Sequence, residues 1–125
     1  MQIDSVYKDM KESERNVAEY LKKLNVFWIF ESPVFVYDEK QRPRVWTPDF
    51  YLPEWGIYIE VCGSEDFNYE YRQKIYFDNG VFVVFIHLYK EGEKWKTYLR
   101  KRIMEIEEYR HSKVMKMIES LLSSK

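Results

Sequence analysis

The fold is decided by the stretch Thr47-Pro48-Asp49-Phe50-Tyr51-Leu52, which continues after Pro53-Glu54-Trp55-Gly56 as Ile57-Tyr58-Ile59-Glu60-Val61-Cys62-Gly63. Both outer parts are typical of β-strands because apolar and aromatic residues dominate them, whereas the four residues between them indicate a turn. Two antiparallel strands that are joined by a short turn lie next to each other in a sheet. We therefore expect Asp49 and Glu60 to lie side by side at one end of a sheet.

The alternation of side chains along these strands predicts which residues share a face. Asp49 and Tyr51 point to one face of the first strand, and Glu60 and Cys62 share a face of the second. Either acid alone could be a solvated strand residue, since acidic side chains are mostly exposed. However, Glu60 lies in an apolar strand, and a carboxylate there needs a partner such as a cation. The pair predicts an oxygen-rich site for Mg²⁺ or Mn²⁺, ions that polarise a phosphodiester and activate water.

A third acidic candidate, Glu14, lies in a segment of about residues 9–24 that has helical periodicity. Positions 10, 14, 17, 18, 21 and 24 form one stripe of this helix, and all of them except Glu14 are apolar. Glu14 is therefore expected to face the sheet, whereas Glu19 points away into solvent. Two interpretations of Glu14 stay open: it contributes to the acidic site, or it caps the helix end or pairs with an arginine.

Composition restricts the class of protein. The chain has 125 residues, of which 46% are hydrophobic and 33% are charged, and this suits one domain with a single core. The net charge of −1 means that nucleic-acid binding would depend on a local patch. One cysteine excludes an internal disulfide and fits an intracellular, cytoplasmic setting. No apolar run has transmembrane length, so no membrane partner is expected.

The order of the expected elements is helix, three strands, helix, strand and terminal helix. This order predicts an α/β fold around a mixed sheet, with a core at about 10–90 and a C-terminal helical extension at about 92–122 in one domain of residues 1–125. The expected segments after the first helix are extended runs within 26–37, strands at about 44–52 and 56–62, a helix at about 66–78, a strand at 81–89 and one or two helices at about 92–122.

The sequence Pro48-Asp49, followed by Glu60-Val61-Cys62, resembles the signature of the PD-(D/E)XK nuclease superfamily. That family has a restriction-endonuclease-like αβββαβ core, in the order given above, and an acidic residue on the first helix often completes its site, as Glu14 would here. The resemblance covers about residues 10–90. It implies a metal-dependent endonuclease that hydrolyses phosphodiester bonds in DNA. Asp49, Glu60 and the carbonyl of Val61 would hold Mg²⁺ or Mn²⁺, and Glu14 would bind a second ion or a metal-bound water.

Cys62 departs from the family pattern, because that position usually carries a lysine that offsets transition-state charge. Three interpretations follow. The basic role has moved to the next helix, where Lys74 is the first choice, Arg72 is the second, and Gln73 also lies within reach. Alternatively, the metal suffices, as in branches that resemble very-short-patch-repair endonucleases. The third is a catalytically inactive module that binds nucleic acid or serves in assembly.

Basic residues outside the acidic site are candidates for phosphate contacts. Arg42 and Arg44 lie on a polar loop, and a basic cluster that includes Lys90 and Arg102 follows the last strand. An ordinary solvated face explains the second group equally well, because glutamates are interleaved with it. The terminal helix carries an apolar stripe through Ile103, Ile106, Tyr109, Val114, Met117, Ile118 and Leu121. This stripe packs on the domain or on a second copy, so a homodimer is a hypothesis.

Overall fold

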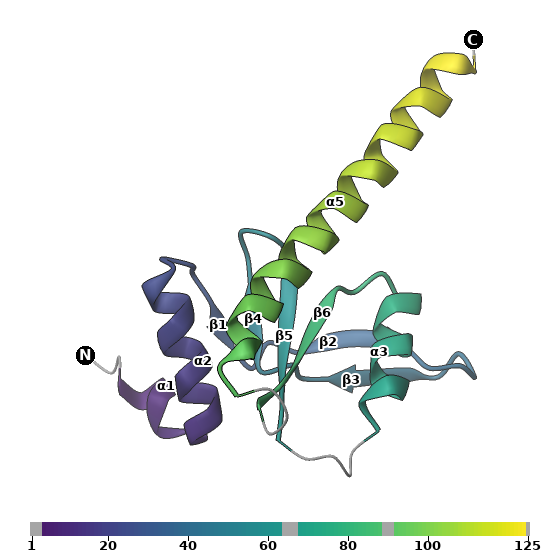
Figure 1. Ribbon diagram of the computed structural model, residues 1–125. Helices are drawn as coiled ribbons and strands as arrows, with labels where there is room; N and C mark the ends of the chain where they lie inside the picture. Colours follow the sequence, from purple (N-terminus) through teal and green to yellow (C-terminus); the bar gives the residue numbers. More distant parts are fainter. Residues whose placement is uncertain (1–3, 64–67, 89–91, 125) are drawn as a thin grey trace.

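The computed structural model describes residues 4–63, 68–88 and 92–124 (Figure 1). Lys90 and the first residues of the helix expected from residue 66 lie outside these ranges. The elements, in chain order, are α1 (Asp4–Lys8), α2 (Glu12–Lys23), β1 (Ile29–Phe30), β2 (Val34–Tyr37), β3 (Pro43–Trp46), β4 (Phe50–Leu52), β5 (Ile57–Cys62), α3 (Tyr69–Asp78), β6 (Val83–His87) and α5 (Lys94–Ser123).

Four strands form the central sheet, in the spatial order β1-β4-β5-β6. The first three are antiparallel neighbours, and β6 runs parallel to β5 after the crossover through α3. The predicted α/β class, the mixed sheet and the C-terminal helix are therefore confirmed. In the β4–β5 register Phe50 faces Ile59, so the ladder ends where Asp49 and Glu60 stand opposite each other.

The extended segments within 26–37 and 44–52 are each divided between two sheets, which the sequence did not predict. A single strand over 44–52 is wrong, because β3 ends at Trp46 and the buried Pro48 separates it from β4. Proline cannot donate to a strand ladder, so the chain leaves one sheet here and enters another. β2 and β3 form a separate antiparallel hairpin, with Val34 facing Trp46.

The hairpin is attached to α3 by side-chain hydrogen bonds. Tyr37 donates its backbone N–H to Asn79 Oδ1 at 2.9 Å, and Asn79 Nδ2 donates to the Tyr37 carbonyl at 2.9 Å. The Tyr71 hydroxyl donates to Glu39 Oε2 at 2.6 Å. These bonds hold the hairpin over one face of the molecule beside α3 (Figure 1).

Helices cover both faces of the central sheet. On one face, Val17, Ala18 and Leu21 of α2 are fully buried and belong to the same cluster as Ile59 and Leu99. On the other face, α3 packs on β5 and β6 through a second cluster. The buried members of this second cluster are Val34, Val36, Cys62, Ile75, Tyr76, Val83 and Phe85. The sheet thus lies between two hydrophobic layers, as an α/β domain requires.

The first helix is shorter than expected, because α2 begins at Glu12 and a separate α1 precedes it. The expected stripe holds for Met10, Val17 and Leu21, but Leu24 is exposed, since the helix has ended before it. Over the described residues, no helix is both long enough and apolar enough to cross a lipid bilayer.

Candidate functional site

Asp49 directly precedes β4. Beyond the last backbone pair of β4 and β5, its side chain makes the next hydrogen bond between the two chain segments. Its Oδ2 accepts the backbone N–H of Val61 at 2.7 Å. The residue is half-buried, so the bond fixes the carboxyl group against the end of β5 rather than in solvent. The predicted pairing of β4 and β5 therefore holds the Asp49 side chain against the neighbouring strand.

Glu60 lies on β5, opposite Asp49, on the sheet face that α3 covers. Its carboxyl group accepts a hydrogen bond from the backbone N–H of Asp49. Its other oxygen, Oε1, is buried and has no hydrogen-bond partner. Because leaving a buried polar atom unpaired costs about 1–3 kcal/mol, this oxygen requires an explanation, and a bound cation supplies one.

Glu14 reaches the same place from α2, on the opposite side of the sheet edge. It is buried, and its Oε1 accepts the backbone N–H of Lys11 at 2.8 Å, which caps the helix. The same carboxyl group also shares a hydrogen bond with Asp49. Glu14 therefore caps α2 and at the same time lies next to Asp49.

Asp49 and Glu60 both have raised pKa values. Burial raises the pKa of Asp49 to about 8; the charges of Glu60 and Glu14 add to this effect, and the Val61 N–H opposes it. Burial likewise raises the pKa of Glu60 to about 7, with Glu14 adding and Arg72 opposing. Raised pKa values in closely spaced, buried carboxyls are typical of functional sites.

Asp49, Glu60 and the carbonyl of Val61 supply the kind of oxygen ligands that a divalent ion prefers. In a strand, the N–H and C=O of one residue point to the same side, so the Val61 carbonyl is directed to the edge where its N–H meets Asp49. No group of three acidic, histidine or cysteine side chains among the described residues is arranged to hold an ion by itself. Glu60 Oε1, which has no hydrogen-bond partner, is the oxygen atom that remains available as a metal ligand.

Of the basic candidates on α3, Arg72 is the one that acts on Glu60. The charge of Arg72 lowers the pKa of Glu60, and its guanidinium lies 4.5 Å from the centre of the Trp46 ring. Lys74, the first choice from sequence, instead forms an ion pair with Asp78 at 2.6 Å, and its side chain is 70% exposed. Gln73 is exposed as well. The structure therefore favours Arg72 over Lys74 as the cation nearest the acidic site.

Two further residues of this region bear on its chemistry. The Cys62 thiol is buried, and burial together with the charges of Glu60 and Asp49 raises its pKa to about 12, so it stays neutral. The Tyr76 side chain of α3 is buried as well. Its hydroxyl lies beside Arg72, and burial and the charge of Glu60 raise its pKa to about 12. The spacing from Arg72 to Tyr76, one helical turn, was the sequence signal that the two share a face.

Arg42 and Arg44 do not meet the acidic site; they belong to the turn of the β2–β3 hairpin. Each forms an ion pair with Asp38 Oδ2 at 3.1 Å. The Arg42 N–H, the two guanidinium groups and the Lys40 N–H lower the pKa of Asp38 to about 2. About half of each arginine side chain stays exposed, so contacts with phosphate remain sterically open at this turn.

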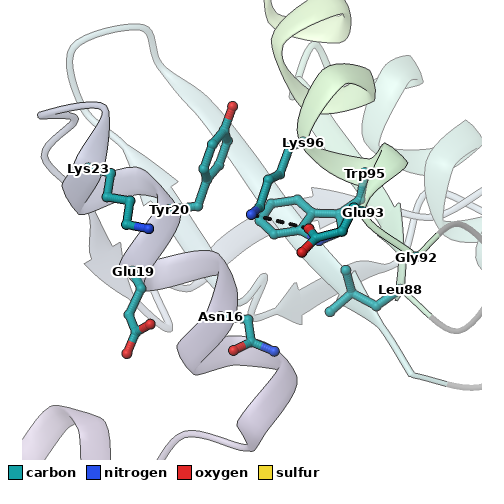
Figure 2. Close-up of a pocket in the computed structure, with 9 residues that line it drawn as sticks. All are labelled: Asn16, Glu19, Tyr20, Lys23, Leu88, Gly92, Glu93, Trp95 and Lys96. Carbon is teal, nitrogen blue, oxygen red and sulfur yellow. Dashed lines mark ion pairs between the residues drawn. The ribbon is translucent and has the colours of Figure 1, made fainter.

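A separate cleft lies between α2 and the beginning of α5 (Figure 2). It has a volume of about 410 Å³, and Tyr20 and Trp95 form its aromatic wall. None of the three acids lines it. Its lysines are offset by Glu19 and Glu93, and Lys96 forms an ion pair with Glu93 at 3.1 Å. The cleft therefore offers no unbalanced positive charge for a phosphate group.

No protein-family model, curated protein or solved structure matches this chain. The functional assignment consequently depends on the site geometry.

Proposed function

We propose that the protein is a metal-dependent endonuclease that hydrolyses phosphodiester bonds in DNA, with a PD-(D/E)XK-type site on a restriction-endonuclease-like core. One observation carries the proposal. Glu14, Asp49 and Glu60, which are distant in sequence, act on one another at a single edge of the sheet, and a buried oxygen of Glu60 there has no partner.

The topology supports the same assignment. α2 precedes the antiparallel strands β1, β4 and β5, and α3 leads to the parallel β6. This is the helix, three-strand meander, helix and strand order of the superfamily, with the β2–β3 hairpin inserted between the first two sheet strands. Asp49 precedes the second strand of the meander and Glu60 lies in the third, which are the positions that the motif requires.

In this proposal Asp49, Glu60 and the Val61 carbonyl hold Mg²⁺ or Mn²⁺, and Glu14 orients Asp49 or a bound water. The ion would supply a Lewis acid and lower the pKa of a bound water. Arg72 takes the electrostatic role of the missing lysine, because it already offsets the charge of Glu60. Arg42, Arg44 and Gln73 are proposed to contact DNA phosphates, and Lys74 is retained only as a second basic group on α3.

The direct test is nicking of supercoiled plasmid by the purified chain with Mg²⁺ or Mn²⁺. We expect Asp49→Asn and Glu60→Gln to reduce the rate by at least about a hundredfold, because each removes a charged ligand. The matched control is Glu54→Gln, a substitution at an exposed acid in the turn at the other end of the β4–β5 hairpin. Equal nicking by all four proteins would identify a contaminating nuclease and refute the assignment.

Cys62 favours a second candidate, a module that kept the fold and binds nucleic acid without cleaving it. The neutral, buried thiol cannot stabilise developing negative charge. In that case DNA binding should weaken with salt and should survive Asp49→Asn, and no metal should support cleavage. A filter-binding titration at several salt concentrations, run beside the nicking assay, separates the two candidates.

A further inference from the structure

Arg72 of α3 is held beside the acidic site by a contact from outside its own helix. Its guanidinium carbon lies 4.5 Å from the centre of the Trp46 ring, which belongs to strand β3 of the hairpin. Both residues are half-buried. A guanidinium stacks on an aromatic face, and the attraction grows as water is removed from the pair. The Trp46 ring therefore favours one position of a side chain that is flexible by itself.

The Trp46 ring is fixed in turn by its neighbours. It meets the buried Tyr76 ring edge to face, with 5.3 Å between the ring centres and 79° between the ring planes. In the β2–β3 register Trp46 faces Val34, which is also buried. The ring contact with Arg72 therefore cannot shift unless α3 or the hairpin moves.

The stripe of α3 that carries Arg72 also attaches the hairpin. Arg72, Tyr76 and Asn79 follow one another at spacings of four and three residues, so they lie along one side of the helix. Arg72 and Tyr76 contact Trp46, and Asn79 bonds to the backbone of Tyr37 at 2.9 Å. The hairpin thus packs on α3 at the side chain that stands nearest to the acidic site.

Arg72 acts on Glu60 without bonding to the oxygen that the site leaves available. The charge of Arg72 lowers the pKa of Glu60, so the two groups are neighbours. Among the described residues, the buried Glu60 Oε1 nevertheless has no hydrogen-bond partner. A mobile guanidinium would bond to such an oxygen, because charge-assisted hydrogen bonds are strong and an unpaired buried acceptor is unfavourable. The contact with the Trp46 ring accounts for the separation.

We propose that Trp46 is a positioning residue, which holds Arg72 beside the acidic site and away from Glu60 Oε1. This role rests on the proposed function, because it concerns the metal site of the nuclease. With Arg72 held back, Oε1 stays available to a divalent ion, and the guanidinium stays available to the negative charge of a phosphate at that ion. Trp46 acts through Arg72 and not by contact with the ion.

The test is the affinity of the full-length chain for Mn²⁺ without DNA, measured by titration calorimetry at about pH 8, where the carboxyl groups lose their protons to the ion. Trp46→Leu releases the guanidinium, which then competes with the ion for Glu60 Oε1, so the dissociation constant should rise by about fivefold or more. Trp46→Phe keeps an aromatic face and should stay within about twofold of wild type. Adding Arg72→Gln to Trp46→Leu removes the competing group and should return the constant to that of Arg72→Gln alone.

Restoration by the second substitution separates positioning from general support of the fold, because a distorted site would not recover when another side chain is removed. Tyr71→Phe is the matched control. It removes the hydrogen bond from α3 to Glu39 of the hairpin and leaves Arg72 in place, so the Mn²⁺ affinity should not change. An unchanged constant in Trp46→Leu, or a double variant that binds as weakly as Trp46→Leu, would overturn the proposal.

These outcomes are distinct from those of the nicking assay. The expected pattern of Mn²⁺ affinities without any nicking would refute the nuclease and support the role of Trp46. Nicking by wild type together with a Mn²⁺ affinity that is insensitive to Trp46→Leu would do the reverse. A chain that binds no Mn²⁺ would overturn both.

Discussion

At the residue scale, the raised pKa values of Asp49 and Glu60 predict a stability that falls as pH rises. Between about pH 4 and pH 8 the folded state keeps protons that the unfolded chain releases, because the ordinary values are 3.8 and 4.5. Stability is therefore greatest below pH 4 to 5 as far as these groups are concerned, and it is lost as pH rises through 7 to 8. In urea titrations, Asp49→Asn with Glu60→Gln should reduce the loss between pH 5 and pH 8 by about 1 kcal/mol or more. Glu54→Gln should retain the wild-type slope.

The same groups predict how metal acts on stability. An ion binds the deprotonated carboxylates and only the folded state assembles them, so Mn²⁺ should raise the melting temperature more at pH 8 than at pH 5. The increase should vanish in Asp49→Asn. An increase of equal size in wild type and variant would show that the ion binds elsewhere, whatever the nicking assay reports.

The meeting of these three acids could be predicted from the sequence, but the basic residue nearest to them could not. Strand alternation identified Asp49 and Glu60, and helical spacing identified Glu14, because both periodicities are visible in the sequence. The choice between Arg72 and Lys74 could not be made in this way. The two residues point about 200° apart on a helix, and only packing against the sheet decides which one meets Glu60.

At the element scale, the main departure from the sequence prediction is the β2–β3 hairpin. The segments 26–37 and 44–52 both read as strands, but their apolar patterns do not show that each is divided between two sheets. Pro48 carries part of the signal, since it cannot donate within a ladder. The rest depends on Asn79, a residue that reads as a helix stop and in fact also binds the hairpin.

Asn79→Ala should therefore destabilise the protein by about 1–2 kcal/mol, because the Tyr37 N–H and carbonyl both lose a partner. Tyr71→Phe removes the other side-chain bond between hairpin and α3, which is a single bond, and should cost less than about 0.5 kcal/mol. Urea unfolding with unchanged m-values would measure both. Equal effects would mean that the hairpin is held by its apolar contacts alone.

At the scale of the whole molecule, the order of the elements predicted an α/β fold with a mixed sheet and a C-terminal helix, which the structure confirms. The helical periodicity after residue 92 did not show where α5 leaves the domain. Ile103 and Ile106 pack against the core, whereas Ile118 belongs to the same apolar pattern and is exposed. Periodicity records that a face is apolar, and it does not record what covers that face.

Ending the chain at Arg110 separates these two halves of α5. The truncated protein should keep the core contacts of α5, so its melting temperature in dilute solution should stay within a few degrees of that of the full chain. Loss of the cooperative unfolding transition would instead show that residues 111–125 belong to the core.

The Arg110 guanidinium of α5 donates hydrogen bonds to the carbonyls of Trp55 and Gly56 in the β4–β5 turn, and this contact has a mechanical consequence. The hairpin that carries this turn at one end carries Asp49 and Glu60 at the other, and α5 continues without interruption from Arg110 to its tip. Arg110 is thus a direct connection between α5 and the hairpin that carries the acidic pair. Any change in the position of α5 at Arg110 requires the β4–β5 turn to move with it or these hydrogen bonds to break.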